Sequence, residues 1–322
     1  MNKYKVLVMQ ALPEAGMALF RARPDVDVEV VPEGSEADLL ARIGEADGIT
    51  LRVSPFTARI IDAASRLRIA SRFGVGYDSV DVPALTRRGI PLAIAGEANS
   101  VSVAEHALFL MLALAKQCLG HDRSVRDDNW GWRAGLHGTD LWTKTVLILG
   151  YGRIGRRTAR RCLAFDMNTL VYDPYVDQDM IARDGAKPVA DFRAVLSEVD
   201  FVTVHTPKTP ETTGIIGRDE LAAMKPTAFV INTARGGIVD EAALYDALKA
   251  GRIRGAGLDV FDLEPPGEHP LFALDNVILS PHIAGVTKEA GDRMAIAAAQ
   301  NVLDAFDGRL NPDNVVNKEV LK

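Results

Sequence analysis

Residues 145–155 read Thr-Val-Leu-Ile-Leu-Gly-Tyr-Gly-Arg-Ile-Gly, a stretch with a short apolar run followed by three glycines at close spacing. Its apolar, β-branched run Val146–Leu149 predicts a buried strand, the glycines predict a turn, and the segment that follows is compatible with a helix. Gly150 permits a tight turn, Gly152 leaves the backbone open to a pyrophosphate, and Gly155 lets the helix pack closely on the strand. The N-terminus of such a helix offers unpaired N–H groups and a positive dipole end to phosphate groups.

A second predicted strand, Thr169–Tyr172, ends at Asp173, which lies 18 positions after Gly155 (173 − 155). A carboxylate at this place accepts hydrogen bonds from both hydroxyls of a ribose and repels a 2′-phosphate. For an isolated GxGxxG an ordinary tight turn is the alternative. A strand before the glycines, a helix after them and an acid at this distance favour a Rossmann βαβ unit that binds NAD rather than NADP.

The composition is that of a globular protein of two domains. The chain has 322 residues, of which 48% are hydrophobic and 25% charged, and its net charge is −6. This balance argues against a nucleic-acid partner, and the most apolar stretch, Ala107–Ala115, is too short to span a membrane. The N-terminus lacks the pattern of a signal peptide, so we expect a cytoplasmic protein. Cys118 and Cys162 lack metal-ligand spacing and are expected to be buried free thiols, and we expect no metal.

Strand-like and helix-like segments alternate along the chain, which predicts parallel βαβ units. The predicted class is α/β, with two doubly wound parallel-sheet domains, Rossmann-like or flavodoxin-like, and the active site in the cleft between them. Long apolar helices at 101–119 and 288–306 flank the nucleotide-binding segment. We therefore expect a discontinuous substrate domain, residues 1–100 with 287–322, and an NAD-binding domain, residues 101–286.

Two further segments carry specific expectations. Residues 121–144 are polar and have no clear period, and they contain Trp130, Trp132 and Trp142. Tryptophans grouped in an irregular stretch favour an interface over a catalytic pocket. After the nucleotide motif, the pattern predicts another helix at Asp191–Ser197.

Chemically distinctive residues follow predicted strands in the second half of the chain. Ligands of an open α/β sheet meet the loops at the carboxyl ends of its strands, and here these loops contain Arg235, Glu264 and His282. An Arg can hold the carboxylate of a 2-keto acid in bidentate geometry and polarise its ketone. A His can deliver the proton, a neighbouring carboxylate keeps the imidazolium charged and oriented, and a nicotinamide would supply the hydride.

Each of these residues has another interpretation when taken alone. Arg235 fits a solvated loop cation, His282 a helix cap and Glu264 a surface acid. Their combination at strand ends nevertheless favours the interpretation that they act together on a 2-keto acid. No Ser/His/Asp order, metal-spaced cluster or Lys-containing phosphate loop competes with it. We expect no catalytic role for four other histidines, His205, His121, His137 and His269. The backbone at His205 is nevertheless expected to contact a cofactor.

With these residues in place, the chain resembles the D-isomer-specific 2-hydroxyacid dehydrogenases, the family of phosphoglycerate, glycerate/hydroxypyruvate and D-lactate dehydrogenases. The resemblance covers essentially the whole chain. It rests on these motifs: Gly74-Val75-Gly76-Tyr77-Asp78, Asn99 with Ala104-Glu105, Leu149–Gly155, Thr206-Pro207 with Glu211-Thr212-Thr213-Gly214, Asn232–Gly237, Leu258–Phe261, Glu264-Pro265 and Ser280-Pro281-His282.

The resemblance implies roles for individual residues. Arg235, Glu264 and His282 are then the catalytic residues, with His282 as acid and base, and Asp259 is similar to the residue that holds the nicotinamide carboxamide. The amides of Val75 and Gly76 are similar to donors for the substrate carboxylate. The expected contacts of the cofactor are Gly150, Gly152, Arg153, Ile154, Gly155, Asp173, His205, Thr206, Pro207, Thr212, Thr233, Ala234, Arg235, Asp259, His282, Ala284 and Gly285.

The resemblance also bears on substrate and assembly. Arg52 matches a substrate-contacting Arg of phosphoglycerate-type members, and Arg133 resembles one that reaches across a dimer; both also fit solvated arginines. We expect a homodimer through residues 101–144 and a short form without a regulatory domain.

The predicted function is that of an NAD-dependent D-2-hydroxyacid dehydrogenase similar to phosphoglycerate dehydrogenase, acting on a small 2-hydroxy or 2-keto acid. One alternative is a glyoxylate/hydroxypyruvate reductase, and another, from a different class, is an NAD-sensing corepressor-like interaction protein. Formate dehydrogenases of this family pair the catalytic His with Gln, so Glu264 argues against that activity.

Overall fold

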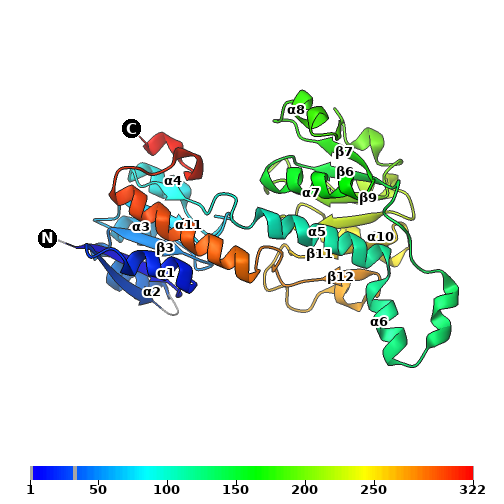
Figure 1. The fold of residues 1–322 in the computed structure, drawn as a ribbon, viewed down its shortest axis with the longest axis horizontal. Coiled ribbons are helices and arrows are strands. Elements are labelled where there is room, and N and C mark those ends of the chain that lie inside the picture. Colours follow the sequence, from blue (N-terminus) through cyan, green and yellow to red (C-terminus); the bar gives the residue numbers. More distant parts are fainter. Residues whose placement is uncertain (1–2, 32–34, 322) are drawn as a thin grey trace. The chain divides into compact units, whose positions relative to one another are not determined.

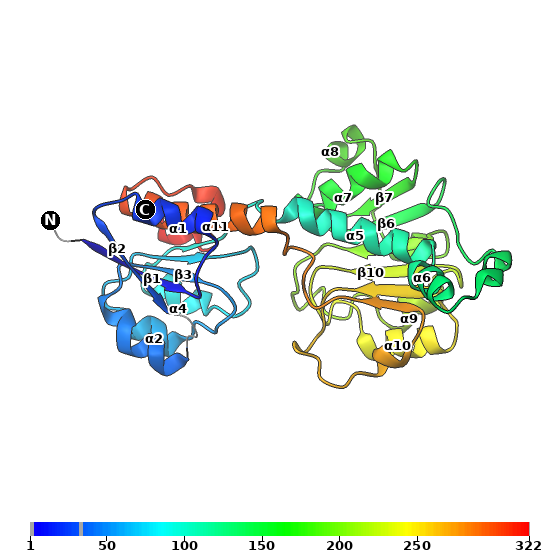
Figure 2. The same ribbon diagram turned by 60° about the horizontal axis from the view of Figure 1, so that its bottom comes forward.

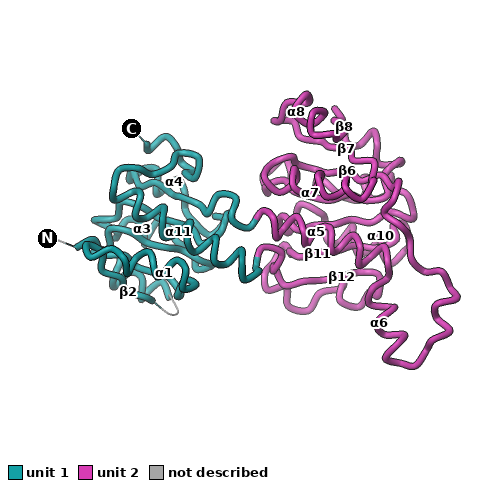
Figure 3. The backbone as a smooth tube through the Cα atoms, viewed as in Figure 1, with its two compact units in different colours: residues 1–99, 286–322 teal, residues 100–285 magenta. Residues whose placement is uncertain are grey.

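The computed structural model describes residues 3–31 and 35–321, and the chain divides into two compact units (Figure 3). Unit 1 comprises residues 1–99 and 286–322, and unit 2 comprises residues 100–285. The chain therefore leaves unit 1 once and returns to it. The limits of these units differ by one residue at each crossing from the domain limits expected from the sequence.

Within its described residues, unit 1 contains a five-stranded sheet in the order β2-β1-β3-β4-β5. All neighbouring strands are parallel. Strand β1 pairs with β2 on one side and with β3 on the other, so that Val6 lies opposite Val28 of β2 and Gly48 of β3. This order is that of flavodoxin-like folds. The strands are β1 (Tyr4–Met9), β2 (Val26–Val31), β3 (Gly48–Leu51), β4 (Ile69–Arg72) and β5 (Leu92–Ala93).

Helices cover both faces of this sheet, as Figure 2 shows. Alternate residues of β1 enter different cores: Val6 and Val8 pack with helices α1 and α11, whereas Leu7 and Met9 pack with α2, α3 and α4. Thr287 caps α11, because its hydroxyl accepts a hydrogen bond from the Ala290 amide at 3.0 Å. The helices are α1 (Glu14–Arg21), α2 (Glu36–Arg42), α3 (Ala58–Ala63), α4 (Val82–Arg87) and α11 (Lys288–Phe306).

Unit 2 is built on a seven-stranded parallel sheet, counted over its described residues, in the order β12-β11-β10-β9-β6-β7-β8. The order reverses direction between β6 and β9, and this switch point is where doubly wound folds bind nucleotides. The strands are β6 (Thr145–Leu149), β7 (Asn168–Tyr172), β8 (Lys187–Pro188), β9 (Phe201–Val204), β10 (Phe229–Asn232), β11 (Gly255–Leu258) and β12 (Val277–Leu279).

Two helix layers enclose the sheet of unit 2 (Figures 1 and 2). The core on one face includes residues of α5, α7 and α8, and the core on the other includes residues of α9 and α10. Helix α5 lies close to β11 because Gly257 has no side chain: a Cβ there would approach Leu110 Cβ to 3.0 Å. The helices are α5 (Ser100–Ala115), α6 (Cys118–Arg126), α7 (Arg153–Ala164), α8 (Gln178–Arg183), α9 (Arg218–Ala223) and α10 (Glu241–Lys249).

The two doubly wound parallel sheets confirm the predicted α/β class, but several local predictions were wrong. The expected helix 101–119 ends at Ala115, and after a 58° bend α6 runs into the stretch predicted to be irregular. Asp191–Ser197 forms only a 3-10 turn at Arg193–Val195, and α8 and β8 were not predicted. Cys118 is exposed rather than buried, because it starts α6, whereas Cys162 is buried.

Over the described residues, no single helix is long and apolar enough to cross a membrane. The pair α5 and α6 reaches the required length and composition only together, across its 58° bend.

Candidate functional site

The glycine turn after β6 has the geometry of a nucleotide-binding loop. Gly150 has φ 95°, a conformation that side chains disfavour, and a Cβ on Gly155 would lie 2.0 Å from the Gly150 carbonyl oxygen. Gly152 is the N-cap residue of α7, and a Cβ there would meet nothing within 4 Å. The turn is therefore tight where the chain packs on itself and open in front of the helix N-terminus, where the backbone amides are available to an anion.

Asp173 is tied directly to this turn. Its Oδ2 accepts a hydrogen bond from the Tyr151 amide at 2.7 Å, and its Oδ1 accepts one from the Tyr175 amide at 2.9 Å. These bonds fix the carboxylate at the end of β7, and each oxygen keeps a lone pair for a further donor. The Tyr151 hydroxyl donates to Asp184 at 3.0 Å and is buried, and burial raises its pKa to about 12. Tyr151 thus stays a neutral donor that holds the end of α8 against the turn.

The loops after β6 and β9 meet at the switch point of the sheet. A Cβ on Gly150 would lie 2.8 Å from the His205 carbonyl oxygen. In the described part of the chain, the buried atoms His205 Nδ1, Thr206 Oγ1 and Thr233 Oγ1 have no hydrogen-bond partner. Buried polar atoms normally find partners, so a group of them at adjacent strand ends fits a polar ligand. NAD is such a ligand, and these loops fit it.

The loop after β10 holds Arg235 in place through Asn232. The Asn232 side chain accepts a hydrogen bond from the Ala234 amide at 3.0 Å and donates one to the Arg235 carbonyl at 2.8 Å. A Cβ on Gly236 would lie 1.9 Å from the Phe261 carbonyl carbon, so this glycine allows the loops after β10 and β11 to touch. The loop that contains Arg235 therefore lies next to residues 261–262, which precede Glu264.

Glu264 and His282 form a hydrogen-bonded pair. His282 Nδ1 lies 2.7 Å from Glu264 Oε2, and Glu264 Oε1 accepts a hydrogen bond from the Phe261 amide at 3.0 Å. An ionised carboxylate only accepts, so Nδ1 carries a proton, and Nε2 is the atom that can gain or lose one. The His282 side chain is 50% exposed, which leaves Nε2 accessible to a small molecule.

Asp259 lies beneath His282 and is fully buried. Its carboxylate accepts hydrogen bonds from Ser280 Oγ at 2.5 Å and from the amides of Ile283 and Ala284 at 2.9 Å each. The Asp259 carbonyl accepts one from the His282 amide at 2.7 Å. The structure thus gives Asp259 an organising function for the loop of His282, whereas its contact with a carboxamide stays a prediction.

Three of the residues expected to contact the substrate, Arg52, Val75 and Gly76, lie in unit 1. Arg52 follows β3, and its guanidinium lies 4.8 Å from the centre of the Phe73 ring, a cation–π contact. Val75 and Gly76 follow β4, and Arg72 Nε donates to the Gly76 carbonyl at 2.6 Å. These residues share one edge of the sheet, because the strands are parallel.

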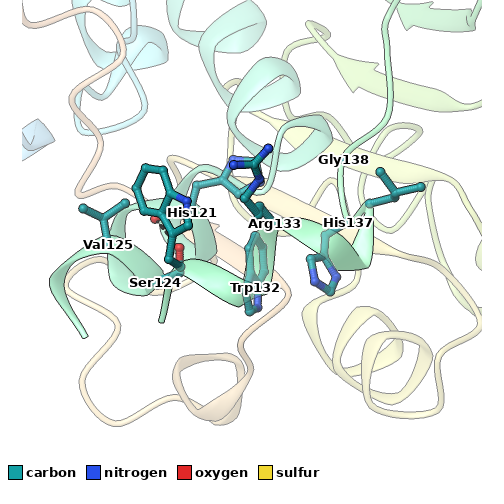
Figure 4. Close-up of a pocket in the computed structure, with 9 residues that line it drawn as sticks. His121, Ser124, Val125, Trp132, Arg133, His137 and Gly138 are labelled. Carbon is teal, nitrogen blue, oxygen red and sulfur yellow. Dashed lines mark hydrogen bonds between the residues drawn. The ribbon is translucent and has the colours of Figure 1, made fainter. Parts of the chain in front are cut away.

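Arg133, the second arginine considered for the substrate, lies elsewhere. It is exposed in unit 2 and lines a hollow of about 300 Å³ around α6 and the 3-10 turn Trp130–Gly135 (Figure 4). His121 and His137 line the same hollow and contact the Trp132 ring. The residues that line this hollow do not include Arg235, Glu264 or His282, so it is separate from these three candidate catalytic residues.

The structure places the remaining expected cofactor contacts on the same sheet edge of unit 2. Arg153 and Ile154 begin α7, and Ala284 and Gly285 follow the His282 loop. The Thr212 hydroxyl donates to the Pro207 carbonyl at 2.7 Å and so closes its own loop. Among the described residues, no cluster of three or more His, Cys, Asp or Glu has the arrangement of a metal site.

Sequence reasoning missed a polar contact beneath the site. His106 of α5 has its Nε2 2.9 Å from Ser280 Oγ, the group that donates to Asp259. A histidine within the apolar helix was the available signal, since such a residue requires a partner when buried. The partner itself comes from 174 positions further along the chain, which no local pattern indicates.

This fold and site define a dinucleotide-binding protein, and comparison with known proteins gives its family. Residues 108–284 match the model of the D-isomer specific 2-hydroxyacid dehydrogenase, NAD binding domain. A D-3-phosphoglycerate dehydrogenase of Archaeoglobus fulgidus is 41% identical over 97% of this chain and 59% of its own length. A glyoxylate reductase of Korarchaeum cryptofilum is 38% identical over 99% of this chain and 98% of its own.

The fold of the chain is also similar to that of a solved structure. The TT0316 protein of Thermus thermophilus has a TM-score of 0.87 and 36% identity, with coverage of 97% of this chain and 99% of that one. The chain belongs to the D-isomer specific 2-hydroxyacid dehydrogenase family, as its motifs predicted, and unit 2 contains the NAD-binding domain of that family. It spans 59% of the length of the phosphoglycerate dehydrogenase relative.

Proposed function

We propose that the protein transfers a hydride between a nicotinamide and C2 of a small D-2-hydroxy or 2-keto acid. The hydrogen bond of 2.7 Å between His282 Nδ1 and Glu264 Oε2 is the observation that supports this most, because it leaves Nε2 as the mobile-proton atom. NAD, when bound at the glycine turn, supplies or takes up the hydride. The glycine turn and this pair belong to the same unit.

The protein residues then have distinct tasks in the reduction of a 2-keto acid. Arg235 holds the substrate carboxylate and polarises the ketone. His282 donates the proton at Nε2 to the carbonyl oxygen as C2 accepts the hydride, and Glu264 stabilises the imidazolium before the transfer. In the oxidation direction the same Nε2 takes the proton from the hydroxyl. The amides of Val75 and Gly76 are the further proposed donors to this carboxylate.

We further propose that phosphohydroxypyruvate is a substrate, with hydroxypyruvate and glyoxylate as the competing candidates. Arg52 is a cation beyond those that a carboxylate and a ketone require. Arg133 lies in a separate hollow of its own chain, so its proposed contact is with the substrate of a second copy in the proposed dimer. Charge-assisted bonds to a phosphate contribute about 1.5–3 kcal/mol each before desolvation. The relatives are named phosphoglycerate dehydrogenase and glyoxylate reductase, which matches both candidates. Nothing in these comparisons favours the corepressor alternative.

A panel of keto acids with NADH, monitored by the nicotinamide absorbance, tests this proposal. Arg52→Ala and Arg133→Ala are expected to lower kcat/KM for phosphohydroxypyruvate by about tenfold or more and to leave glyoxylate reduction nearly unchanged. Arg59→Ala and Arg123→Ala are matched controls, because both replace exposed arginines of the same units. An enzyme that prefers glyoxylate, with neither Arg52 nor Arg133 affecting any substrate, would show that the phosphate assignment is wrong.

The homodimer through residues 101–144 and a cytoplasmic location complete the proposal. The arm formed by α6 and the 3-10 turn exposes large apolar side chains, including Trp130 at 67%, Leu136 at 88% and Val125 at 63%. Apolar groups gathered in this way are typical of surfaces that another chain covers. A second copy of this chain is the proposed occupant. Both cysteines are free thiols, which suits a reducing compartment.

A further inference from the structure

A chain of hydrogen bonds connects helix α5 to the loop that carries His282. It begins at His106 Nε2, which lies 2.9 Å from Ser280 Oγ, and continues from Ser280 Oγ to Asp259 Oδ1 at 2.5 Å. Asp259 in turn accepts the amides of Ile283 and Ala284, the two residues after His282. The His106 side chain is 16% exposed and the Asp259 side chain is fully buried. The chain therefore lies largely away from solvent.

The direction of these hydrogen bonds follows from the number of protons. Ile283 and Ala284 can only donate through their amides, so the Asp259 carboxylate acts as an acceptor, and Ser280 uses its single hydroxyl hydrogen on Oδ1. Ser280 Oγ must then accept from His106, which places a proton on His106 Nε2. Burial lowers the pKa of His106 while Asp259 opposes the effect, so the ring is the neutral Nε2–H tautomer near neutral pH.

The loop needs such an anchor because His282 has an unfavourable backbone conformation. Its φ is 54°, in the left-handed region that residues with side chains rarely adopt, and such strain persists only where surrounding contacts fix it. The contacts that Asp259 supplies are its carbonyl to the His282 amide and its carboxylate to the amides of Ile283 and Ala284. The His282 amide also lies 3.1 Å from the Ser280 carbonyl. An Asp259 oriented by Ser280 can hold both amides at once. Hydrogen bonds in series also polarise one another, so a donor at His106 strengthens the bond from Ser280 to Asp259.

We propose that His106 is a positioning residue: it donates through Ser280 to Asp259 and thereby fixes the loop 280–285 in the conformation that aims His282. The inference rests on the proposed function for its kinetic consequence, but the loop anchor itself does not. His106 and Ser280 touch neither substrate nor cofactor in this account. They act on the rate through the geometry of His282.

Two substitutions at one position separate the donor from the packing of the ring. Gln places an amide N–H close to the position of His Nε2 and keeps the donor, whereas Leu fills similar space without one. Ser280→Ala removes the next member of the chain with the loss of a single oxygen atom, so it keeps the test valid if His106→Leu does not fold. Glu105→Gln is the matched control, because it breaks the adjacent ion pair of α5 with Arg161, at 2.9 Å, outside the chain.

The experiment measures two quantities on each purified variant. Hydrogen exchange of residues 280–285, followed by mass spectrometry without substrate, reports how well the loop is held. His106→Leu and Ser280→Ala are expected to speed this exchange by about fivefold or more, and to lower kcat by about fivefold to twentyfold with the KM for NADH within about twofold. His106→Gln and Glu105→Gln are expected to remain within about twofold of the wild type in both measurements. The double variant His106→Leu/Ser280→Ala is expected to be no worse than the more affected single variant, because both act through one chain.

The outcomes separate the two proposals. Exchange in His106→Leu equal to that of the control overturns the inference, and so does a His106→Gln variant as damaged as His106→Leu, since packing rather than the donor would then matter. A wild type that reduces none of the keto acids overturns the proposed function. Faster exchange in His106→Leu together with its rescue in His106→Gln would still support the loop anchor in that case.

Discussion

His282 shows how one residue combines strain and chemistry. It has φ 54°, its amide donates to the Asp259 carbonyl, and its Nδ1 lies 2.7 Å from Glu264. The types of residue at the strand ends predicted a catalytic set of Arg235, Glu264 and His282; the structure pairs Glu264 with His282, and the catalytic roles stay a prediction. The backbone conformation and the hydrogen bonds to Asp259 could not be predicted, because they depend on contacts between segments that are distant in sequence.

His282→Ala tests the proton transfer at this residue. The variant is expected to lower kcat by about 10² to 10⁴, since it removes the proton donor and acceptor. NADH binding, measured by fluorescence titration, is expected to stay within about twofold of the wild type, because the glycine turn is untouched. A variant with full turnover would exclude His282 as the acid and base.

Glu264→Gln tests the electrostatic part of the pair. The introduced Gln side chain would still accept a hydrogen bond from His282 Nδ1, which lies 2.7 Å from Glu264 Oε2, but it carries no negative charge. The variant is therefore expected to lower kcat for reduction by about tenfold or more and to leave the KM for NADH within about twofold. A kcat equal to that of the wild type would remove Glu264 from the mechanism.

Asp173→Ala tests the choice of cofactor. The wild type is expected to prefer NAD over NADP by at least about tenfold in kcat/KM, because a phosphate against a carboxylate costs more than about 1.4 kcal/mol. The variant is expected to narrow this ratio, and also to bind both cofactors less tightly, because Asp173 holds the Tyr151 amide of the glycine turn. Equal efficiency of the wild type with both cofactors would contradict the assignment.

The limits of helices with a clear apolar period were predicted from the sequence, whereas breaks at polar residues and short polar helices were not. Helix α11 begins and ends as expected, since its alanine-rich face packs on α1 and Thr287 caps it. The break between α5 and α6 was missed because the residue at the break, Gln117, takes φ 53° without a Gly or Pro to signal it. Helix α8 is short and largely exposed, so it has little apolar pattern to read.

Leu136→Asp tests the arm formed by α6 and the 3-10 turn. Leu136 is 88% exposed in this structure, and a charge at the centre of a covered apolar surface is expected to shift the protein from dimer to monomer. Sedimentation of wild type and variant measures this directly. Val53→Asp, at a residue 73% exposed in unit 1, is the matched control. A wild type that is monomeric at all concentrations tested would contradict the proposed dimer.

His205, at the end of β9, is expected to make the stability of unit 2 depend on pH. Burial lowers the pKa of His205 to about 3, and Nε2 already contacts Thr203 Oγ1 at 3.0 Å. Its folded pKa is below the unfolded value, so the unfolded chain binds the proton more readily. The resulting stability is complete above about pH 6.5 and is lost as the pH falls from there towards 3.

As the pH falls from about 7.5 to about 5, the shifted pKa of His205 is expected to lower the free energy of unfolding by about 1 to 2 kcal/mol. This figure is smaller than the full pKa difference would give, because the residue as a whole is only partly buried. His205→Gln should lose less stability over this range in denaturant titrations, whereas His121→Gln should behave as the wild type. Parallel curves for the wild type and His205→Gln would exclude the effect.

At the scale of the whole molecule, periodicity and motifs predicted the two doubly wound sheets and the family. The order of residues along the chain also indicated that it returns to its first part, because long helices flank the nucleotide-binding segment. The roles of Arg52 and Arg133 stay predictions, because Arg52 lies in the loop after β3 and Arg133 in the 3-10 turn Trp130–Gly135, and the surroundings of both come from the tertiary fold.

In the proposed reaction a hydride moves from the nicotinamide to C2 of a 2-keto acid, with His282 as the proton donor. The most direct measurement uses NADH deuterated at both C4 positions, with each keto acid of the panel, and product analysis by NMR and chiral chromatography. We predict a D-2-hydroxy acid that carries deuterium at C2 from the wild type, and at most about one hundredth of that rate from His282→Ala. A wild type that binds NADH but places no deuterium at C2 of any of these acids would contradict the account.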